Sequence, residues 1–212
     1  MKNKDTLAFP SPLQKQRLNF KPVLPSDLCG HDIVTELGAK TSAAGDRDKI
    51  ASIFPNLFGK RIMHLKPSKK KSQPLKRMRI GVVLSGGQAA GGHNCICALF
   101  DFMQNEKAKA SNGKDFKLFG FKNGPRGIFT GDYVELTSKI VDRYRNTGGF
   151  DMIGSGRDKI HTPEQFANSL VHCKKLQLDG LVVIGGDDSN TNACLLAEYF
   201  LSKKSDIGVC GT

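Results

Sequence analysis

Two short apolar runs, each followed by a glycine-rich turn and a segment of helical character, constrain the fold of this chain most strongly. One run covers residues 80–84 and its turn covers 85–94; the other run covers 181–184 and its turn covers 185–192. Strands that alternate with helices pair in parallel, and right-handed connections place the helices on the faces of the sheet. The pattern therefore predicts an α/β fold with a Rossmann-like, doubly wound, mainly parallel sheet.

Further strands and helices are predicted around these two units. Besides the two apolar runs, the predicted strands cover residues 116–121, 150–154 and 207–210. The predicted helices cover residues 95–106, 134–146, 162–176 and 193–201. The third of these has the clearest start, because Thr162 suits the N-cap, Pro163 suits the first helical position and Gln165 completes a capping box.

The first 78 residues differ in composition from the rest, and we expect them to form an irregular extension with a basic linker, followed by an α/β domain at 79–212. Residues 1–79 hold 17 of the 32 Lys and Arg residues but only 6 of the 20 Asp and Glu residues, so the net charge of +12 belongs mainly to this segment. A short helix is predicted at 25–37. Four apolar residues at 53–58 form a small group, and we expect the extension to pack on a larger body.

The basic run at residues 66–77 has two interpretations. It is similar to a nuclear-localisation or nucleic-acid-binding patch, and it also suits a solvated linker. No aromatic residues separate its charges, so stacking on bases is unsupported and nucleic acid is not expected as a partner.

Cysteine spacing and hydropathy indicate a reducing, cytoplasmic location. The six cysteines lack the paired spacing of a zinc site, and we expect reduced, mostly buried thiols. No apolar stretch approaches the roughly 20 residues that span a bilayer. The first residues also lack the apolar run of a secretory signal.

The two glycine-rich turns are expected to open at the same edge of the sheet, where parallel strands end. Glycine lets a backbone turn sharply and approach a ligand, and the free N–H groups at a helix start attract phosphate. The adjacent carboxylates of Asp187 and Asp188 oppose an anion unless one of them holds a divalent metal that the phosphate carries. The alternative is that these residues are only turn and N-cap residues.

The stretches at 81–94, 119–131, 148–159 and 185–192 resemble pyrophosphate-dependent 6-phosphofructokinases of the long, plant-like type. Their order and spacing match as well as their residues, and Gly-Gly-Asp-Asp-Ser-Asn-Thr-Asn is nearly a signature of the catalytic enzymes. The resemblance implies reversible, Mg²⁺-dependent phosphoryl transfer from pyrophosphate to fructose 6-phosphate. It also implies a cytoplasmic glycolytic enzyme that forms homo- or hetero-oligomers.

The resemblance also implies roles for individual residues. It places five residues at the phosphoryl donor: Gly86, Gly87, Arg157, Ser189 and Asn190. Asp187 would hold Mg²⁺. Asp188 stands where ATP-using relatives have glycine, so it would take the space and charge of the α-phosphate of ATP. Two anions in contact repel by about 4 kcal/mol at an effective dielectric constant of 20, which is enough to disfavour ATP strongly.

In this family, the base that accepts the proton of the sugar hydroxyl lies a few residues beyond the position equivalent to Thr212, as do the sugar-phosphate residues. We therefore expect these 212 residues to be the N-terminal part of a longer enzyme, with little or no turnover alone. Two alternatives remain open. One is an ATP-dependent phosphofructokinase, which Asp188 disfavours. The other is a non-catalytic regulatory or interaction subunit of the same assembly, which the Asp187–Asp188 pair disfavours.

Overall fold

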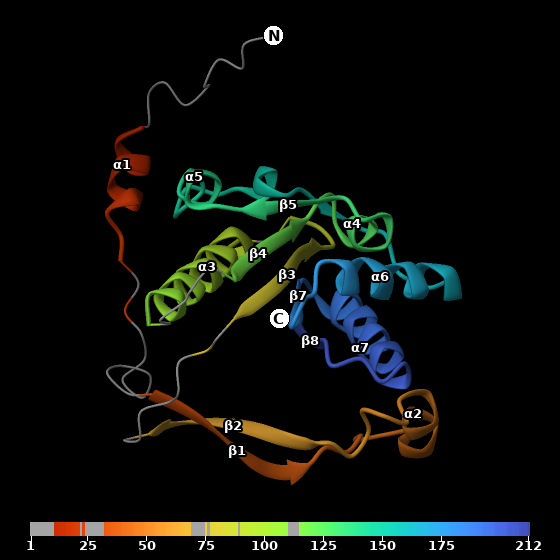
Figure 1. Ribbon diagram of the computed structural model, residues 1–212. Coiled ribbons are helices and arrows are strands. Elements are labelled where there is room, and N and C mark those ends of the chain that lie inside the picture. Colours follow the sequence, from red (N-terminus) through yellow and green to blue (C-terminus); the bar gives the residue numbers. More distant parts are fainter. Residues whose placement is uncertain are drawn as a thin grey trace.

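A computed structural model describes residues 11–21, 23, 32–68, 75, 77–88, 90–109 and 115–212. A six-stranded, mostly parallel sheet with helices on both faces forms the main body of this described part (Figure 1). A separate two-stranded ribbon lies beside that body (Figure 1). The predicted α/β class and the mainly parallel sheet are confirmed.

The strands of the main sheet follow the order β5-β4-β3-β7-β8, and β6 pairs with the end of β3. Their bounds are β3 Met78–Ser85, β4 Phe116–Phe121, β5 Tyr133–Leu136, β6 Ser155–Gly156, β7 Gly180–Ile184 and β8 Gly208–Gly211. Only β5 runs antiparallel to its neighbour among these pairs. The carboxyl ends of β3, β6 and β7 therefore meet at one edge.

The helices cover the two faces of the sheet in two groups (Figure 1). One face carries α3 Gly92–Lys109, α5 Ser138–Val141 and the 3-10 helix η2 Phe150–Met152. The other face carries α4 Pro125–Thr130, α6 Pro163–Lys175 and α7 Asp187–Ser202. The predicted cap of α6 is confirmed, because the side chain of Thr162 accepts from the backbone N–H of Gln165 at 3.2 Å and Gln165 completes the capping box.

Side chains of the central strand β3 alternate between two hydrophobic cores. Val82 and Leu84 pack in the core that includes α3, whereas Val83 packs with Leu181 of β7 in the core that includes α6 and α7. Successive side chains of a strand point to opposite faces, so a strand with helices on both sides must be apolar throughout. This burial explains why residues 80–84 form an uninterrupted apolar run.

Two elements predicted within residues 79–212 are wrong in whole or in part. The helix predicted at 134–146 is instead the strand β5 followed by the short helix α5, because β5 pairs antiparallel with β4 and the ring of Tyr133 packs edge-on against Phe119 at 5.7 Å. The strand predicted at 150–154 is the helix η2, and only Ser155–Gly156 pairs with β3. Gly154 has a φ of +69°, which lies outside the range of extended strands, so the strand begins only after this residue.

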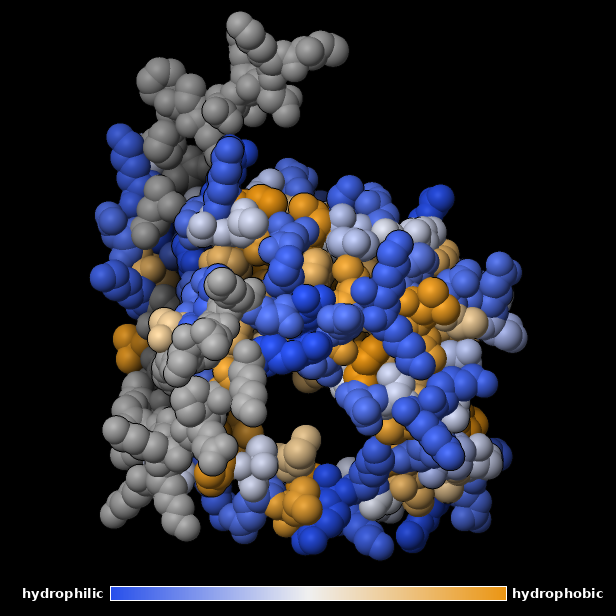
Figure 2. Space-filling model, viewed as in Figure 1, coloured by the Kyte–Doolittle hydropathy of each residue, from blue (hydrophilic) through white to orange (hydrophobic). Residues whose placement is uncertain are grey.

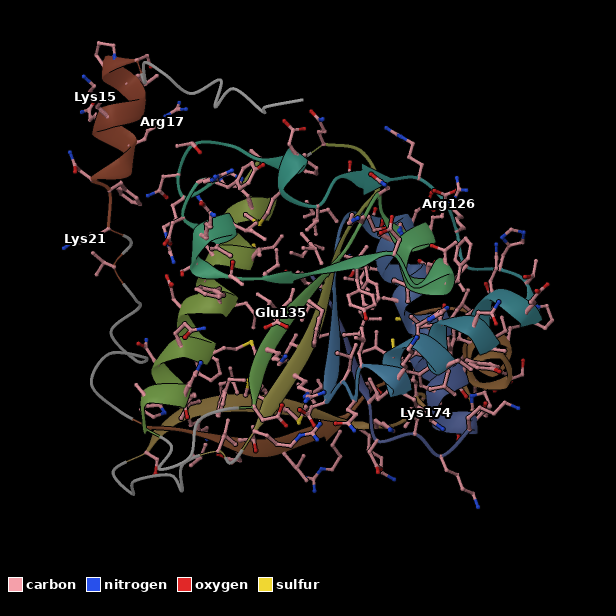
Figure 3. The ribbon with its side chains drawn as sticks, turned by 45° about the horizontal axis from the view of Figure 1, so that its top comes forward. Lys15, Arg17, Lys21, Arg126, Glu135 and Lys174 are labelled. Carbon is pink, nitrogen blue, oxygen red and sulfur yellow. The ribbon has the colours of Figure 1, made fainter. Side chains whose placement is uncertain are left out.

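The N-terminal part contains α1 Pro12–Leu18, β1 Asp32–Lys40, α2 Arg47–Ile53 and β2 Arg61–Ser68. The helix predicted at 25–37 is wrong over residues 32–37, which belong to β1, and residues 25–31 lie outside the described residues. Residues 66–68 of the predicted basic linker belong to β2, whereas 69–74 and 76 lie outside the described residues. Lys15, Arg17 and Lys21 project from α1 and the residues that follow it, apart from α4 and α6 (Figure 3). The boundary between residues 78 and 79 stays a prediction.

The ribbon of β1 and β2 has one apolar face that the described residues leave open. Its antiparallel register places Leu37 opposite Met63 and Thr35 opposite Leu65, and these two pairs share a face. Leu37, Met63 and Leu65 are between 55% and 68% exposed. Hydrophobic residues reach the surface over this ribbon in the space-filling view (Figure 2). A two-stranded ribbon without a covered face has little stability of its own, so β1 and β2 depend on their connections to the body.

A carboxylate on α7 fastens the N-terminal extension to the main body. Glu198 is 9% exposed and accepts hydrogen bonds from the backbone N–H groups of Asn56 and Leu57, at 2.9 and 3.0 Å, and from the Asn56 side-chain amide. The prediction that the extension packs on a larger body is confirmed by this contact, which is made by polar groups.

Replacing Glu198 with glutamine is expected to loosen this attachment by about 1–2 kcal/mol, because one acceptor oxygen becomes an NH₂ group that faces other donors. Limited proteolysis should then cleave residues 41–60 several times faster than in the wild type. Glu164→Gln is the matched control, because Glu164 is an exposed acid in the first turn of α6. Equal cleavage rates in the two variants would show that Glu198 does not hold the extension.

The described cysteines are free thiols. Burial raises the pKa of Cys97 to about 11 and that of Cys173 to about 12, so both thiols stay protonated near neutral pH. Cys95, Cys194 and Cys210 are exposed, so the expectation of mostly buried thiols is wrong for the described cysteines. Within the described ranges, no helix is long and apolar enough to cross a membrane.

Candidate functional site

A pocket of about 500 Å³ opens where the carboxyl ends of β3, β6 and β7 meet. Three segments line it: the turn after β3, the loop after β6 and the first turns of α7. The lining residues are Ser85, Gly86, Gly87, Arg157, Asp158, Lys159, Gly186, Asp187, Asp188, Ser189 and Asn192. The two glycine-rich turns that the sequence predicted at one edge of the sheet therefore lie at a shared pocket.

The turn after β3 needs glycine for two different reasons. Gly86 has a φ of +98°, a conformation that other residues rarely adopt, and its N–H donates to the carbonyl of Gly156 at 2.7 Å. A Cβ atom at Gly87 would lie 2.8 Å from a guanidinium nitrogen of Arg157. This turn therefore brings bare backbone and the Arg157 guanidinium to one end of the pocket.

The second turn is shorter than the sequence indicated, because α7 begins at Asp187 with Gly186 as its N-cap. Residues 187–192 are helical, whereas we expected the helix to follow residue 192. Asp187 and Asp188 thus stand in the first turn of a helix, where the partial positive charge of the N-terminus favours carboxylates. Both residues line the same pocket as Gly86 and Gly87.

The two polar residues that follow the carboxylates make contacts within the protein. The buried hydroxyl of Ser189 is 2.8 Å from the hydroxyl of Ser85, which joins α7 to the end of β3. The amide of Asn190 donates to the carbonyls of Gly185 and Gly186, at 2.9 and 3.1 Å. Ser189 lines the pocket. Asn190 is not among the lining residues, and its amide donates to the backbone instead.

The loop after β6 supplies the basic side of the pocket. Arg157 lies at the glycine end, and Lys159 forms an ion pair of 3.1 Å with Asp188 at the α7 end. The side chains of Lys159 and Asp188 are 58% and 85% exposed, so this pair is well solvated and weak. Two cations of one loop therefore line the pocket, Arg157 beside the turn after β3 and Lys159 beside α7.

The sequence analysis assigned no individual role to five of the lining residues: Ser85, Asp158, Lys159, Gly186 and Asn192. The available signal was the run Ser-Gly-Arg-Asp-Lys at 155–159, where charged residues follow a predicted strand at the expected edge of the sheet. Asn192 gave a weaker signal, because an asparagine after a glycine-rich turn also suits a cap.

A divalent metal fits the carboxylates of this pocket only with help from a ligand. Across the residues that the structure describes, no group of three or more His, Cys, Asp or Glu residues could hold a metal ion. Mg²⁺ is usually held through one or two carboxylates together with substrate phosphates and water. Asp187 and Asp188 in the first turn of α7 match that smaller donor set.

The neutral side chain of His93, at the start of α3, accepts a hydrogen bond from a neighbouring loop. His93 is buried, and burial lowers its pKa below the usual value. Its Nε2 accepts a hydrogen bond from the N–H of Gly148 at 3.2 Å, which requires the unprotonated nitrogen. Its contact supports the fold near the glycine-rich turn rather than the pocket.

Comparisons with known proteins agree with this arrangement. The phosphofructokinase family matches residues 79–212. A pyrophosphate–fructose 6-phosphate 1-phosphotransferase subunit beta 1 of Arabidopsis thaliana is 52% identical over 201 residues, which covers 95% of this chain and 34% of the relative. The Entamoeba histolytica protein named pyrophosphate–fructose 6-phosphate 1-phosphotransferase is 46% identical over 197 residues, which covers 92% of this chain and 35% of the relative.

A solved structure shows the same fold. The crystal structure of a pyrophosphate-dependent phosphofructokinase from Marinobacter aquaeolei matches with a TM-score of 0.52 and 17% identity, and it covers 63% of this chain and 32% of that chain. The chain spans about a third of the length of the curated relatives it matches.

Proposed function

Because this chain belongs to the phosphofructokinase family, we propose that its pocket binds the phosphoryl donor of a phosphotransferase and that this donor is pyrophosphate. The resemblance to the pyrophosphate-dependent members is confirmed by relatives of that name at 52% and 46% identity. The single observation that carries the proposal is the shared pocket of the glycine turn, the Arg157–Lys159 loop and the carboxylates of α7.

Three segments of the pocket offer groups that are complementary to an anion. Gly86 and Gly87 expose backbone, Arg157 presents a planar guanidinium, and the start of α7 adds free N–H groups. Phosphoryl transfer needs little covalent work from a protein, because positioning and fixed positive groups neutralise the charge on the moving group. Mg²⁺ bound at Asp187 would neutralise further charge on the donor.

Asp188 is the residue that we propose makes the pocket select pyrophosphate over ATP. Its carboxylate lines the pocket together with Asp187, and the resemblance implies that the α-phosphate of ATP would need the same space. The ion pair with Lys159 and the high exposure of Asp188 weaken a purely electrostatic exclusion. We therefore propose that Asp188 acts through its volume as well as its charge, and that pyrophosphate fits because it ends before this side chain.

The wider activity follows the family resemblance. We propose that the complete enzyme transfers the phosphoryl group reversibly to fructose 6-phosphate in cytoplasmic glycolysis. The relative from Arabidopsis thaliana is named as a subunit, which supports a homo- or hetero-oligomer. We propose that residues 79–212 supply the donor side of the site, because the resemblance implies that the base and the sugar-phosphate residues lie elsewhere in the complete enzyme.

The proposal is tested by titrating the 212-residue chain with pyrophosphate and with ATP, each in Mg²⁺, in a calorimeter. We expect pyrophosphate to bind at least tenfold more tightly than ATP, and a coupled assay with fructose 6-phosphate to give no turnover above background. Tighter binding of ATP would support the ATP-dependent alternative. Absence of binding for both donors would support the non-catalytic subunit instead. Robust turnover would contradict the proposal that this chain supplies only the donor side of the site.

A further inference from the structure

The pocket is built from three segments, and each pair of segments is joined by a separate contact. The turn after β3 is joined to β6 through the Gly86 N–H and the Gly156 carbonyl, 2.7 Å apart. The end of β3 is joined to α7 through the hydroxyls of Ser85 and Ser189. The third pair, the loop after β6 and the helix α7, is joined by Asn192.

Asn192 makes this third connection with both ends of its side-chain amide. Its Oδ1 accepts from the N–H of Ile160 at 3.0 Å, and its Nδ2 donates to the carbonyl of the same residue at 2.6 Å. Ile160 is 1% exposed and belongs to the core shared with α6 and α7. The reciprocal pair therefore anchors the end of the 157–160 loop at a fixed point on α7.

The ion pair between the same two segments is much weaker. It joins the side chains of Lys159 and Asp188, which are 58% and 85% exposed. Such exposed pairs contribute about 0–1 kcal/mol, and salt screens them further. The two part-buried hydrogen bonds of Asn192 contribute more, because a buried backbone group that loses its partner stays desolvated. Asn192 and the buried side chain of Ile160 therefore fix the end of the loop on α7 together.

The loop carries both basic residues of the described pocket lining. Arg157 lies against Gly87 in the turn after β3, and Lys159 lies against Asp188 of α7. A donor with two phosphates can contact both cations at once, whereas a single phosphate needs only one. The spacing of the two cations should therefore matter more for pyrophosphate than for orthophosphate.

We propose that Asn192 is a positioning residue that matches the pocket to the length of pyrophosphate, an inference that rests on the proposed function. It acts by holding the Arg157–Lys159 loop against α7, so that the two cations are already spaced for two linked phosphates. Asn192 affects the ligand only by positioning this loop, and it does so through its two hydrogen bonds to Ile160.

The test compares the affinities of the 212-residue chain for pyrophosphate and orthophosphate in Mg²⁺, by calorimetry. In Asn192→Ala, the dissociation constant for pyrophosphate is expected to rise about tenfold, whereas that for orthophosphate changes by less than about twofold. Thr191→Ala is the matched control and should change neither constant, because the Thr191 hydroxyl bonds only within α7, to the Asp187 carbonyl at 3.0 Å. Asn192→Ser, with helix content checked by circular dichroism, serves if the alanine variant does not fold.

Each outcome has a distinct meaning. A parallel loss of affinity for both ligands would overturn the inference, because it would show a general structural effect. A wild-type preference for pyrophosphate that persists unchanged in Asn192→Ala would overturn the inference and leave the proposed function standing. A wild-type chain without any preference for pyrophosphate over orthophosphate would overturn both.

Discussion

The Asp188→Gly variant is expected to bind ATP about 30-fold more tightly relative to pyrophosphate than the wild type does. Two unit charges in contact repel by about 4 kcal/mol at an effective dielectric constant of 20. Asp188 is 85% exposed and paired with Lys159 at 3.1 Å, so we reduce that figure to about 2 kcal/mol, or about 30-fold. Removing the side chain also opens space along the first turn of α7.

Parallel titrations of both donors in Mg²⁺ measure this selectivity ratio. Asp188→Asn separates the two causes, since it removes the charge and keeps the volume; a ratio near the glycine value would assign the effect to charge. Asp206→Asn is the control for net charge, because Asp206 is exposed and does not line the pocket. If the ratio of ATP affinity to pyrophosphate affinity is unchanged in Asp188→Gly, then Asp188 does not select the donor.

The Asp187→Asn variant is expected to bind pyrophosphate about 100-fold more weakly in Mg²⁺. The amide keeps the volume of the carboxylate but is a poor ligand for a hard cation that prefers charged oxygen. In EDTA, the effect of the substitution on pyrophosphate affinity should reverse. Without the metal, the carboxylate of Asp187 repels pyrophosphate, so the variant should bind at least as tightly as the wild type.

Titration of one variant in two buffers therefore distinguishes a metal ligand from a structural residue. A loss of affinity that is equal in Mg²⁺ and in EDTA would contradict a role of Asp187 toward the metal. Asp151→Asn is the control, because Asp151 is an exposed acid outside the lining of the pocket. It should leave both affinities unchanged.

Elements with strong local signals were predictable from the sequence. The strand β4 matches its predicted bounds, and α6 begins at the predicted Thr162 cap. Both follow from signals within a few residues of one another: an apolar run in the strand and a capping box at the helix start. The pocket edge was predictable for the same reason, because glycine-rich turns directly follow two buried strands.

The elements that failed depend on distant partners. Residues 133–136 form a strand because they pair with β4 and pack Tyr133 on Phe119, and nothing within that segment indicates this pairing. Residues 32–40 form a strand because residues 61–68 lie opposite them. The roles of individual site residues and the boundary at residue 79 remain predictions, since both concern what the chain binds or how it divides.

The sequence by itself determined the α/β class, the family and the edge of the sheet at which the pocket opens. These depend on local spacing, which the order of residues fixes directly. Only the tertiary structure decided that Lys159 faces Asp188 and that Asn192 holds Ile160, because each pair is about 30 residues apart in the chain and meets only when the loop after β6 packs on α7. Contacts of that kind depend on how segments stack, which the pattern of a single segment does not encode.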